Sequence, residues 1–146
     1  MKVEIKIDGD CTEPKIVVVT DRVTDEINEM VKIISGFRAT VLAGFSDGQA
    51  TVLDPETIYR VYSSGGKVYA ETEKGEYLLR LRLYEAEQHL LNLSFARISN
   101  GEIINIKKVK GFDLSFVGTI RVSLTNGTVT YVSRRYVSKI KKLLGL

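Results

Sequence analysis

Apolar and polar residues alternate with a period of two along much of this chain, a pattern typical of β-strands with one buried face. In the first forty residues this alternation predicts strands over residues 2–7 and 15–20, separated by a turn at 9–14. After these strands the spacing becomes helical, with Thr24 as a candidate N-cap and Gly36 as a candidate stop. One face of the expected helix carries Val23, Ile27, Met30, Val31 and Ile34. The beginning of the chain is therefore expected to form a β-β-α segment.

The rest of the chain is expected to consist mainly of short strands joined by glycine-containing turns. Strands are predicted over residues 40–45, 49–53, 58–62, 68–72, 76–81, 95–98, 102–104, 109–114, 118–124 and 128–132. A helix is predicted over residues 83–91. Asn126-Gly127, which lies between two apolar alternating runs, is the strongest hairpin signal in the sequence.

The final segment predicts an amphipathic helix that begins after Ser133, a candidate N-cap. Its apolar arc consists of Tyr136, Val137, Ile140, Leu143 and Leu144. The remaining face is largely basic and consists of Arg134, Arg135, Ser138, Lys139, Lys141 and Lys142. Two arginines at the start of a helix lie where the helix dipole disfavours cations, which suggests an anionic ligand there.

Charge divides the chain unequally. Residues 1–96 hold 11 basic and 16 acidic residues, and residues 97–146 hold 10 basic and 2 acidic residues, a balance of +8. A basic region of this kind favours a polyanionic ligand, because each neutralised phosphate releases counterions. A solvated basic face is the alternative that charge alone leaves open.

Length and composition indicate a soluble globular protein of one domain with a short extension. The chain has 146 residues, of which 44% are hydrophobic and 27% charged. It shows no signal peptide and no apolar run of the ~20 residues that a membrane helix needs, so we expect a cytoplasmic location. Its single cysteine, Cys11, provides no disulfide or zinc site, and no cofactor is expected. The single histidine, His89, lies in a helical pattern without catalytic partners, so we do not expect an enzyme.

Two segments resemble signatures of a known family. The first, Phe95-Ala96-Arg97-Ile98-Ser99-Asn100-Gly101-Glu102-Ile103-Ile104-Asn105, fits a pattern F-x-R followed by an aliphatic pair and Asn. The second begins with Asn126-Gly127 and continues to Val132-Ser133-Arg134-Arg135-Tyr136. Both resemble the LytTR DNA-binding domains of bacterial transcription regulators, and the resemblance covers roughly residues 41–146. Gly101 and Glu102 depart from the family pattern, and an acidic side chain at Glu102 would be unfavourable beside phosphate.

The resemblance implies how the chain would contact DNA. Domains of this family read duplex DNA through loops of an elongated β fold that enter successive major grooves. The implied base contacts are Lys67, Asn100 and Arg135. The implied or charge-based backbone contacts are Arg97, Ser99, Lys107, Lys108, Ser133, Arg134, Lys139 and Lys142. At two places a structural interpretation competes, because the glycines before Lys67 and the pair Asn100-Gly101 also suit ordinary turns.

Together these observations predict a mainly β, α+β fold: an elongated, antiparallel LytTR-like domain over residues 41–146 with a C-terminal amphipathic helix, preceded by a β-β-α extension over residues 1–40. The expected function is a sequence-specific transcriptional regulator that binds tandem promoter sites in double-stranded DNA as a homodimer. The extension would mediate dimerisation or receive a signal. The resemblance also implies a small membrane protein that restrains the regulator. The alternatives are a protein-interaction module that docks an acidic partner and an RNA-binding β domain.

Overall fold

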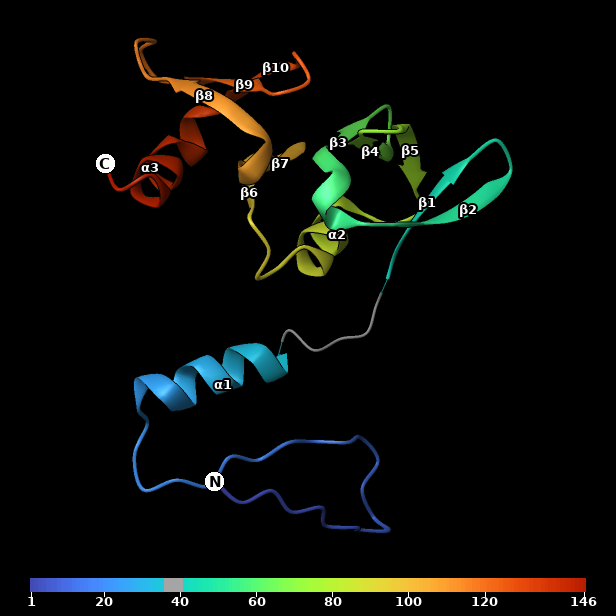
Figure 1. The fold of residues 1–146 in the computed structure, drawn as a ribbon, viewed down its shortest axis with the longest axis vertical. Coiled ribbons are helices and arrows are strands. Elements are labelled where there is room, and N and C mark those ends of the chain that lie inside the picture. Colours follow the sequence, from blue (N-terminus) through green and yellow to red (C-terminus); the bar gives the residue numbers. More distant parts are fainter. Residues whose placement is uncertain (36–40) are drawn as a thin grey trace. The chain divides into compact units, whose positions relative to one another are not determined.

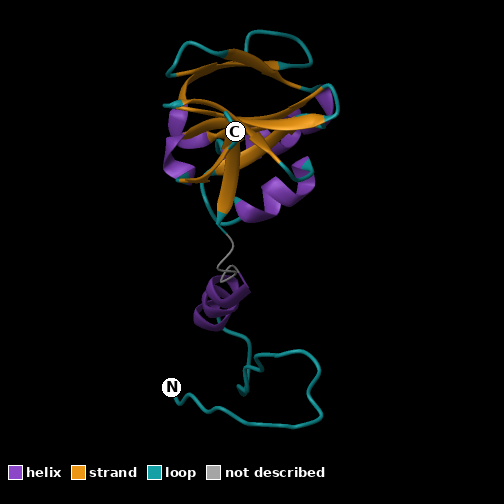
Figure 2. Cartoon of the chain, turned by 90° about the vertical axis from the view of Figure 1, so that its right-hand side faces the viewer, coloured by secondary structure: helices purple, strands orange, loops and turns teal. Residues whose placement is uncertain are grey.

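The chain divides into two compact units, residues 1–35 and 36–146, in a computed structural model that describes all residues except 36–40. Residues 1–24 contain a turn at Gly9–Asp10 but no helix or strand, as the loop colouring in Figure 2 shows. Helix α1 (Asp25–Ser35) follows. No helix among the described residues is long and apolar enough to cross a bilayer.

The two strands expected at residues 2–7 and 15–20 are therefore absent, and the β-β-α interpretation of the extension was wrong in its β part. The aliphatic side chains that suggested strands are exposed, Ile5 by 92% and Ile7 by 94%. An isolated two-stranded hairpin is at best marginally stable in water, because a strand gains little unless its apolar face is covered. The expected turn does form, since the Cys11 amide donates to the Asp8 carbonyl at 3.1 Å.

The helical part of that segment was predicted correctly. Thr24 Oγ1 accepts a hydrogen bond from the Ile27 amide at 3.3 Å, as an N-cap does. The predicted stop at Gly36 and the predicted strand start at Thr40 lie outside the described residues.

The second unit is built on a seven-stranded antiparallel sheet with the strand order β2-β1-β5-β4-β3-β7-β6 (Figure 1). Its strands are β1 (Leu42–Ser46), β2 (Gln49–Leu53), β3 (Ile58–Ser64), β4 (Lys67–Thr72), β5 (Gly75–Leu79), β6 (Phe95–Ser99) and β7 (Glu102–Asn105). Short 3₁₀ turns, η1 (Pro55–Thr57) and η2 (Ile106–Lys108), precede β3 and follow β7. Helix α2 (Leu83–His89) lies between β5 and β6 in the chain.

A three-stranded sheet and the last helix complete this unit. The strands are β8 (Val109–Asp113), β9 (Ile120–Leu124) and β10 (Val129–Val132), in the order β10-β9-β8, and the helix is α3 (Arg134–Leu143). The Asn126-Gly127 turn joins β9 to β10 as predicted, and Gly127 has a φ of +93°. The predicted mainly antiparallel β fold with a C-terminal helix is thus confirmed.

Two apolar cores lie on the opposite faces of the large sheet. The first includes Ile58, Val61, Ile103 and α2, through Leu83 and Ala86. The second joins Ile98 and Ile104 of the large sheet to β9, β10 and α3. Ile103 and Ile104 are neighbours in sequence but belong to different cores, as alternation along a strand requires. All four residues of β7 are buried, so this strand fixes the position of the turn that precedes it.

Candidate nucleic-acid interface

Three segments implicated by the sequence lie side by side at one edge of the second unit. The Ser63 amide donates to the Gly101 carbonyl at 2.8 Å, which joins the end of β3 to the β6–β7 turn. The Ser133 amide donates to the Ile98 carbonyl at 2.9 Å, which joins β6 to the start of α3. We call residues 63–67, 99–101 and 133–136 the loop edge. The three predicted base-contacting residues, Lys67, Asn100 and Arg135, all belong to it.

Lys67 is the first residue of β4 and is exposed. It pairs with Ser64 across the two-residue turn Gly65-Gly66. Both glycines have positive φ, +58° and +77°, which suits the tight turns that connect hairpin strands. The glycines are thus required by the turn itself, and the exposed Lys67 ammonium lies at the end of the hairpin.

Asn100 is exposed at the tip of the β6–β7 turn, and its side chain is held from α3. The Tyr136 hydroxyl donates to Asn100 Oδ1 at 3.2 Å. Within the turn, Ser99 Oγ accepts from the Gly101 amide at 3.2 Å. The serine and the tyrosine therefore order the turn, and the Asn100 amide nitrogen has no hydrogen-bond partner within the described residues.

A contact with the DNA backbone, as predicted for Arg97, would require an exposed guanidinium, but the Arg97 side chain is mostly buried. Its side chain is only 16% exposed. Nε donates to the Ser99 carbonyl at 2.8 Å, and Nη2 donates to the Asn100 carbonyl at 2.6 Å. Nη1 lies 3.5 Å from Glu87 Oε2. All three guanidinium nitrogens are thus engaged within the protein.

The start of α3 presents Arg134 and Arg135, both exposed. The Arg134 guanidinium lies against the β8–β9 loop, where a Cβ added to Gly118 would be 3.2 Å from Nη2. Arg135 takes part in no ion pair or side-chain hydrogen bond within the described part of the chain. Ser133 occupies the N-cap position, as predicted, but its side chain makes no capping hydrogen bond.

The predicted lysine contacts lie in two different places. Lys139 and Lys142 are exposed on α3, on the side away from the fully buried Ile140. Lys107 and Lys108 follow β7 at its far end, about 13 Å from the β6–β7 turn at ~3.3 Å per strand residue. Lys108 Nζ lies 2.6 Å from Glu73 Oε1, a hydrogen bond that raises the pKa of Lys108. These last two lysines are therefore not part of the loop edge.

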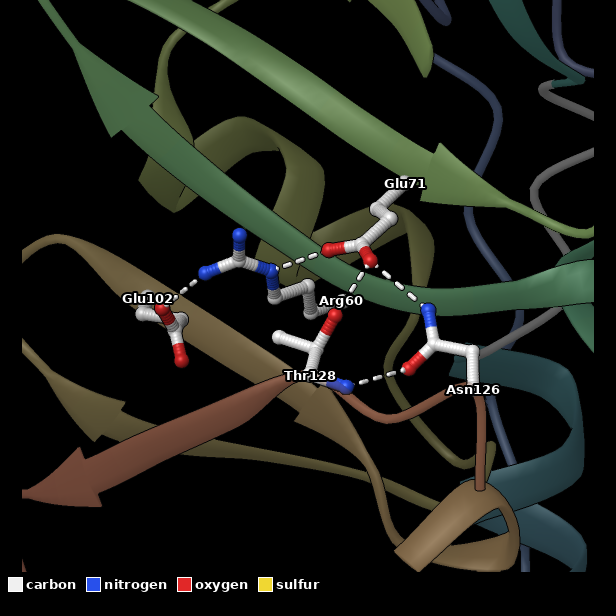
Figure 3. Close-up of polar contacts among 5 residues, drawn as sticks. All are labelled: Arg60, Glu71, Glu102, Asn126 and Thr128. Carbon is white, nitrogen blue, oxygen red and sulfur yellow. Dashed lines mark hydrogen bonds and ion pairs between the residues drawn. The ribbon is translucent and has the colours of Figure 1, made fainter. Parts of the chain in front are cut away.

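Sequence reasoning did not find a polar network that joins the two sheets (Figure 3). Arg60 of β3 pairs with Glu71 of β4 through Nε and with Glu102 of β7 through Nη1, the latter at 2.9 Å. Glu71 Oε1 also accepts from Asn126 Nδ2 at 2.7 Å and from Thr128 Oγ1 at 2.6 Å. The network thus fastens the β9–β10 turn to the large sheet.

The network also sets the ionisation of Glu71. Burial, the largest single influence, raises the pKa of Glu71, but hydrogen bonds from Thr128, Arg60 and Asn126 together with the Arg60 charge outweigh it. The pKa of Glu71 therefore lies below its ordinary value. Burial lowers the pKa of Arg60, and its two carboxylate partners reverse this effect and raise it.

The side chain of Glu102, which would be unfavourable beside phosphate, is turned into the protein. Its side chain is 12% exposed and its Oε1 is bonded to Arg60. Arg60 therefore compensates one oxygen of this residue inside the protein, whereas Oε2 is buried without a hydrogen-bond partner among the described residues. Arg60 reaches Glu102 because β3 pairs with β7, with Tyr62 opposite Glu102. This pairing could not be predicted from the sequence.

Comparisons with known proteins agree with this architecture. The family described as LytTr DNA-binding domain matches residues 48–145. The chain is 29% identical over 147 residues to uncharacterized HTH-type transcriptional regulators of Staphylococcus aureus strains NCTC 8325 and COL, covering 100% of this chain and 99% of each relative. A solved LytTr DNA-binding domain from Bacillus cereus superimposes with a TM-score of 0.70 at 24% identity, covering 75% of this chain and 100% of that one.

Proposed function

Because this chain belongs to the LytTr DNA-binding domain family, we propose that it is a transcriptional regulator that recognises specific duplex sequences through its loop edge. The observation that carries the proposal is the grouping of Lys67, Asn100 and Arg135. These three exposed side chains come from segments that are bonded to one another through Ser63, Gly101, Ile98 and Ser133. Rigid placement matters because base recognition needs donors held in fixed geometry.

The three side chains suit the chemistry of base edges in the major groove. Arginine donates two parallel hydrogen bonds to guanine O6 and N7, and asparagine pairs in a similar way with adenine. The lysine ammonium donates to the same two guanine acceptors, O6 and N7, but without the planar fork of arginine. We assign Arg135, Asn100 and Lys67 to these base contacts.

The phosphate contacts of this proposal come from the same edge and from α3. They are Ser99, Ser133, Arg134, Lys139 and Lys142. Backbone amides at a helix N-terminus attract anions, and the Ser133 side chain leaves the first turn of α3 uncapped. Lys107 and Lys108 are left out because they lie at the other end of β7.

Two alanine variants test this assignment. Arg135→Ala should weaken binding to a selected duplex by about 1–3 kcal/mol and should reduce the preference over unrelated duplex. Lys142→Ala should weaken binding to both duplexes similarly and should reduce the salt slope by about one. Titrations at several salt concentrations measure both effects, after selection of bound fragments from a random duplex library. Equal losses of preference in both variants would contradict the assignment of Arg135.

The competing functions are separated by the choice of ligand. Duplex DNA, single-stranded DNA and RNA of the same sequence are titrated with the full chain. A regulator of this kind prefers one duplex sequence, whereas an RNA-binding domain prefers RNA, and a module for acidic proteins shows no sequence preference. If the full chain prefers no duplex sequence over the others, the proposed function is wrong.

We further propose that the chain acts as a homodimer on tandem sites, with residues 1–40 mediating self-association or receiving a signal. Support comes from the exposed aliphatic residues of the first segment and from helix α1, which has no buried residue. Such apolar surface favours association, since water contact with it is unfavourable. A restraining membrane partner is a further proposal that rests on the family resemblance alone.

A further inference from the structure

We infer that Tyr136 and Arg97 are positioning residues that set the specificity of Asn100, by holding its side chain and its backbone in one orientation. This inference rests on the proposed function and deepens it, because it assigns two residues to the recognition of one base pair without direct contact. Tyr136 holds Asn100 Oδ1, and Arg97 holds the carbonyls of Ser99 and Asn100.

The contacts of Arg97 suit a clamp on the turn. Its guanidinium donates to two successive carbonyls, at 2.8 and 2.6 Å, on the strand side of the tip. Glu87 of α2 lies 3.5 Å from the third nitrogen, Nη1, and neutralises part of the charge. With its side chain only 16% exposed and Nε and Nη2 both donating to backbone carbonyls, Arg97 presents little of its guanidinium to a phosphate. Its charge therefore acts on the turn and not on DNA.

The contact of Tyr136 determines how the Asn100 amide is presented. An exposed asparagine can rotate its amide and exchange donor for acceptor at the same place. Because the Tyr136 hydroxyl donates to Oδ1, that oxygen faces α3 and Nδ2 is left for an outside acceptor. Purine N7 is such an acceptor in the major groove, and Oδ1 retains a second lone pair for an adenine amino group.

The same contact ties the two principal readers together. Tyr136 follows Arg135 in the first turn of α3, and its hydroxyl reaches the tip of the neighbouring turn. The Ser133 amide reaches Ile98 from the same turn of helix. Asn100 and Arg135 are therefore held as one unit, so the base pairs that they read have a fixed spacing.

The test uses the full chain, the duplex that the wild-type chain selects most strongly from a random library, and the single-base variants of that duplex. Asn100→Ala identifies the base pair that depends on Asn100, where we expect a loss of discrimination of about 5- to 100-fold. Tyr136→Phe removes only the hydroxyl and should reduce discrimination at that same base pair by about 3- to 10-fold, since one fixed orientation becomes several. Discrimination at the base pair that depends on Arg135 should change less than at the Asn100 position.

Arg97→Lys separates a clamp from a phosphate contact. Lysine retains the charge but lacks the planar fork, so we expect discrimination at the Asn100 base pair to fall while the salt dependence of binding stays unchanged. If Arg97 instead contacted a phosphate, Arg97→Lys would retain discrimination at the Asn100 base pair. Arg97→Gln would then reduce the salt slope of binding by about 0.9. The second pattern would overturn the assignment of Arg97.

Controls distinguish positioning from loss of structure. Tyr131→Phe is the matched control, because the Tyr131 ring packs edge-on against Phe116 while its hydroxyl makes no hydrogen bond within the described residues. Its discrimination should equal that of the wild type. The double variant Asn100→Ala/Tyr136→Phe should discriminate no worse than Asn100→Ala alone, since the hydroxyl then has nothing to orient. A further loss in the double variant would show that Tyr136 acts independently and would overturn the inference.

The possible failures are distinguishable. A wild-type chain that selects no duplex overturns the proposed function. If Asn100→Ala discriminates between base pairs as well as the wild type, Asn100 has no role in recognition, and this inference fails with it. If Asn100→Ala loses discrimination but Tyr136→Phe and Arg97→Lys retain it, this inference is wrong and the proposed function stands.

Discussion

The substitution Arg60→Met tests the network that joins the two sheets. Arg60 is the only cation that the described residues place between Glu71 and Glu102, and its guanidinium also lies 4.2 Å from the centre of the Tyr62 ring. Methionine retains the aliphatic stem and an apolar contact with that ring, so the substitution removes mainly the charge and its hydrogen bonds.

The magnitude follows from burial. Removing one partner of a fully buried ion pair costs about 3–5 kcal/mol, because the other charge remains unpaired. Here the side chains of Arg60, Glu71 and Glu102 are 22%, 21% and 12% exposed, so solvent reduces this cost. Glu71 also retains its hydrogen bonds from Asn126 and Thr128, whereas Glu102 loses the one side-chain partner that it has among the described residues. We expect a loss of about 2–4 kcal/mol at pH 7, or about 10–20 °C in Tm for a domain of this size.

Thermal unfolding followed by circular dichroism measures this loss, with Arg80→Met as the control. Arg80 lies 4.0 Å from the Phe45 ring but makes no ion pair within the described residues, so its loss should cost at most about 1 kcal/mol.

The pH dependence provides a second test. The pKa of Glu71 is lowered in the folded state, so its contribution to stability is present above its ordinary pKa and is lost as the pH falls through the folded value. In Arg60→Met the hydrogen bond and charge of Arg60 no longer lower the pKa of Glu71, so Glu71 is protonated at a higher pH than in the wild type. The gap between wild type and variant should therefore narrow from pH 7 to pH 4, and a constant gap would refute the electrostatic reasoning.

Two further predictions concern packing and assembly. Gly44→Ala should destabilise the second unit by about 1–3 kcal/mol in urea unfolding, because the added Cβ would lie 2.7 Å from Tyr77 Cβ in the neighbouring strand; an unchanged midpoint would contradict the contact. A chain that begins at residue 41 should sediment as a smaller oligomer than the full chain, since the exposed aliphatic residues of the first segment would be missing. If both chains sediment as the same oligomer, residues 1–40 have another role.

Much of the second unit could be predicted from local patterns. The alternation around Asn126-Gly127 gave the correct turn, and the expected strands lie within a few residues of β1 to β10. Such features depend on residues close together in the chain, where turn chemistry and alternation act directly. The last helix was also predicted, although Leu143, expected on its apolar arc, is 50% exposed.

The interactions between distant segments could not be predicted in this way. Arg60 and Glu71 come from β3 and β4, and Thr128 comes from the β9–β10 turn; nothing in their sequence spacing indicates that they meet. The same holds for Tyr136 and Asn100. The strands expected in residues 2–7 and 15–20 fail for a related reason, since alternation provides an apolar face but not the surface that must cover it.

Strand β10 connects the network to the loop edge. The β9–β10 turn before it is fastened to the large sheet through Glu71, and Ser133 directly after it is fastened to β6 through Ile98. Its four residues, with Val132 fully buried in the second core, span about 13 Å at ~3.3 Å per residue. A strand held at both ends and along its length has little freedom to tilt, so α3 begins at a fixed place relative to β6. If Arg135 and Asn100 contact bases as we propose, Glu71 supports that recognition without touching DNA, because it helps to hold the frame on which the two side chains stand.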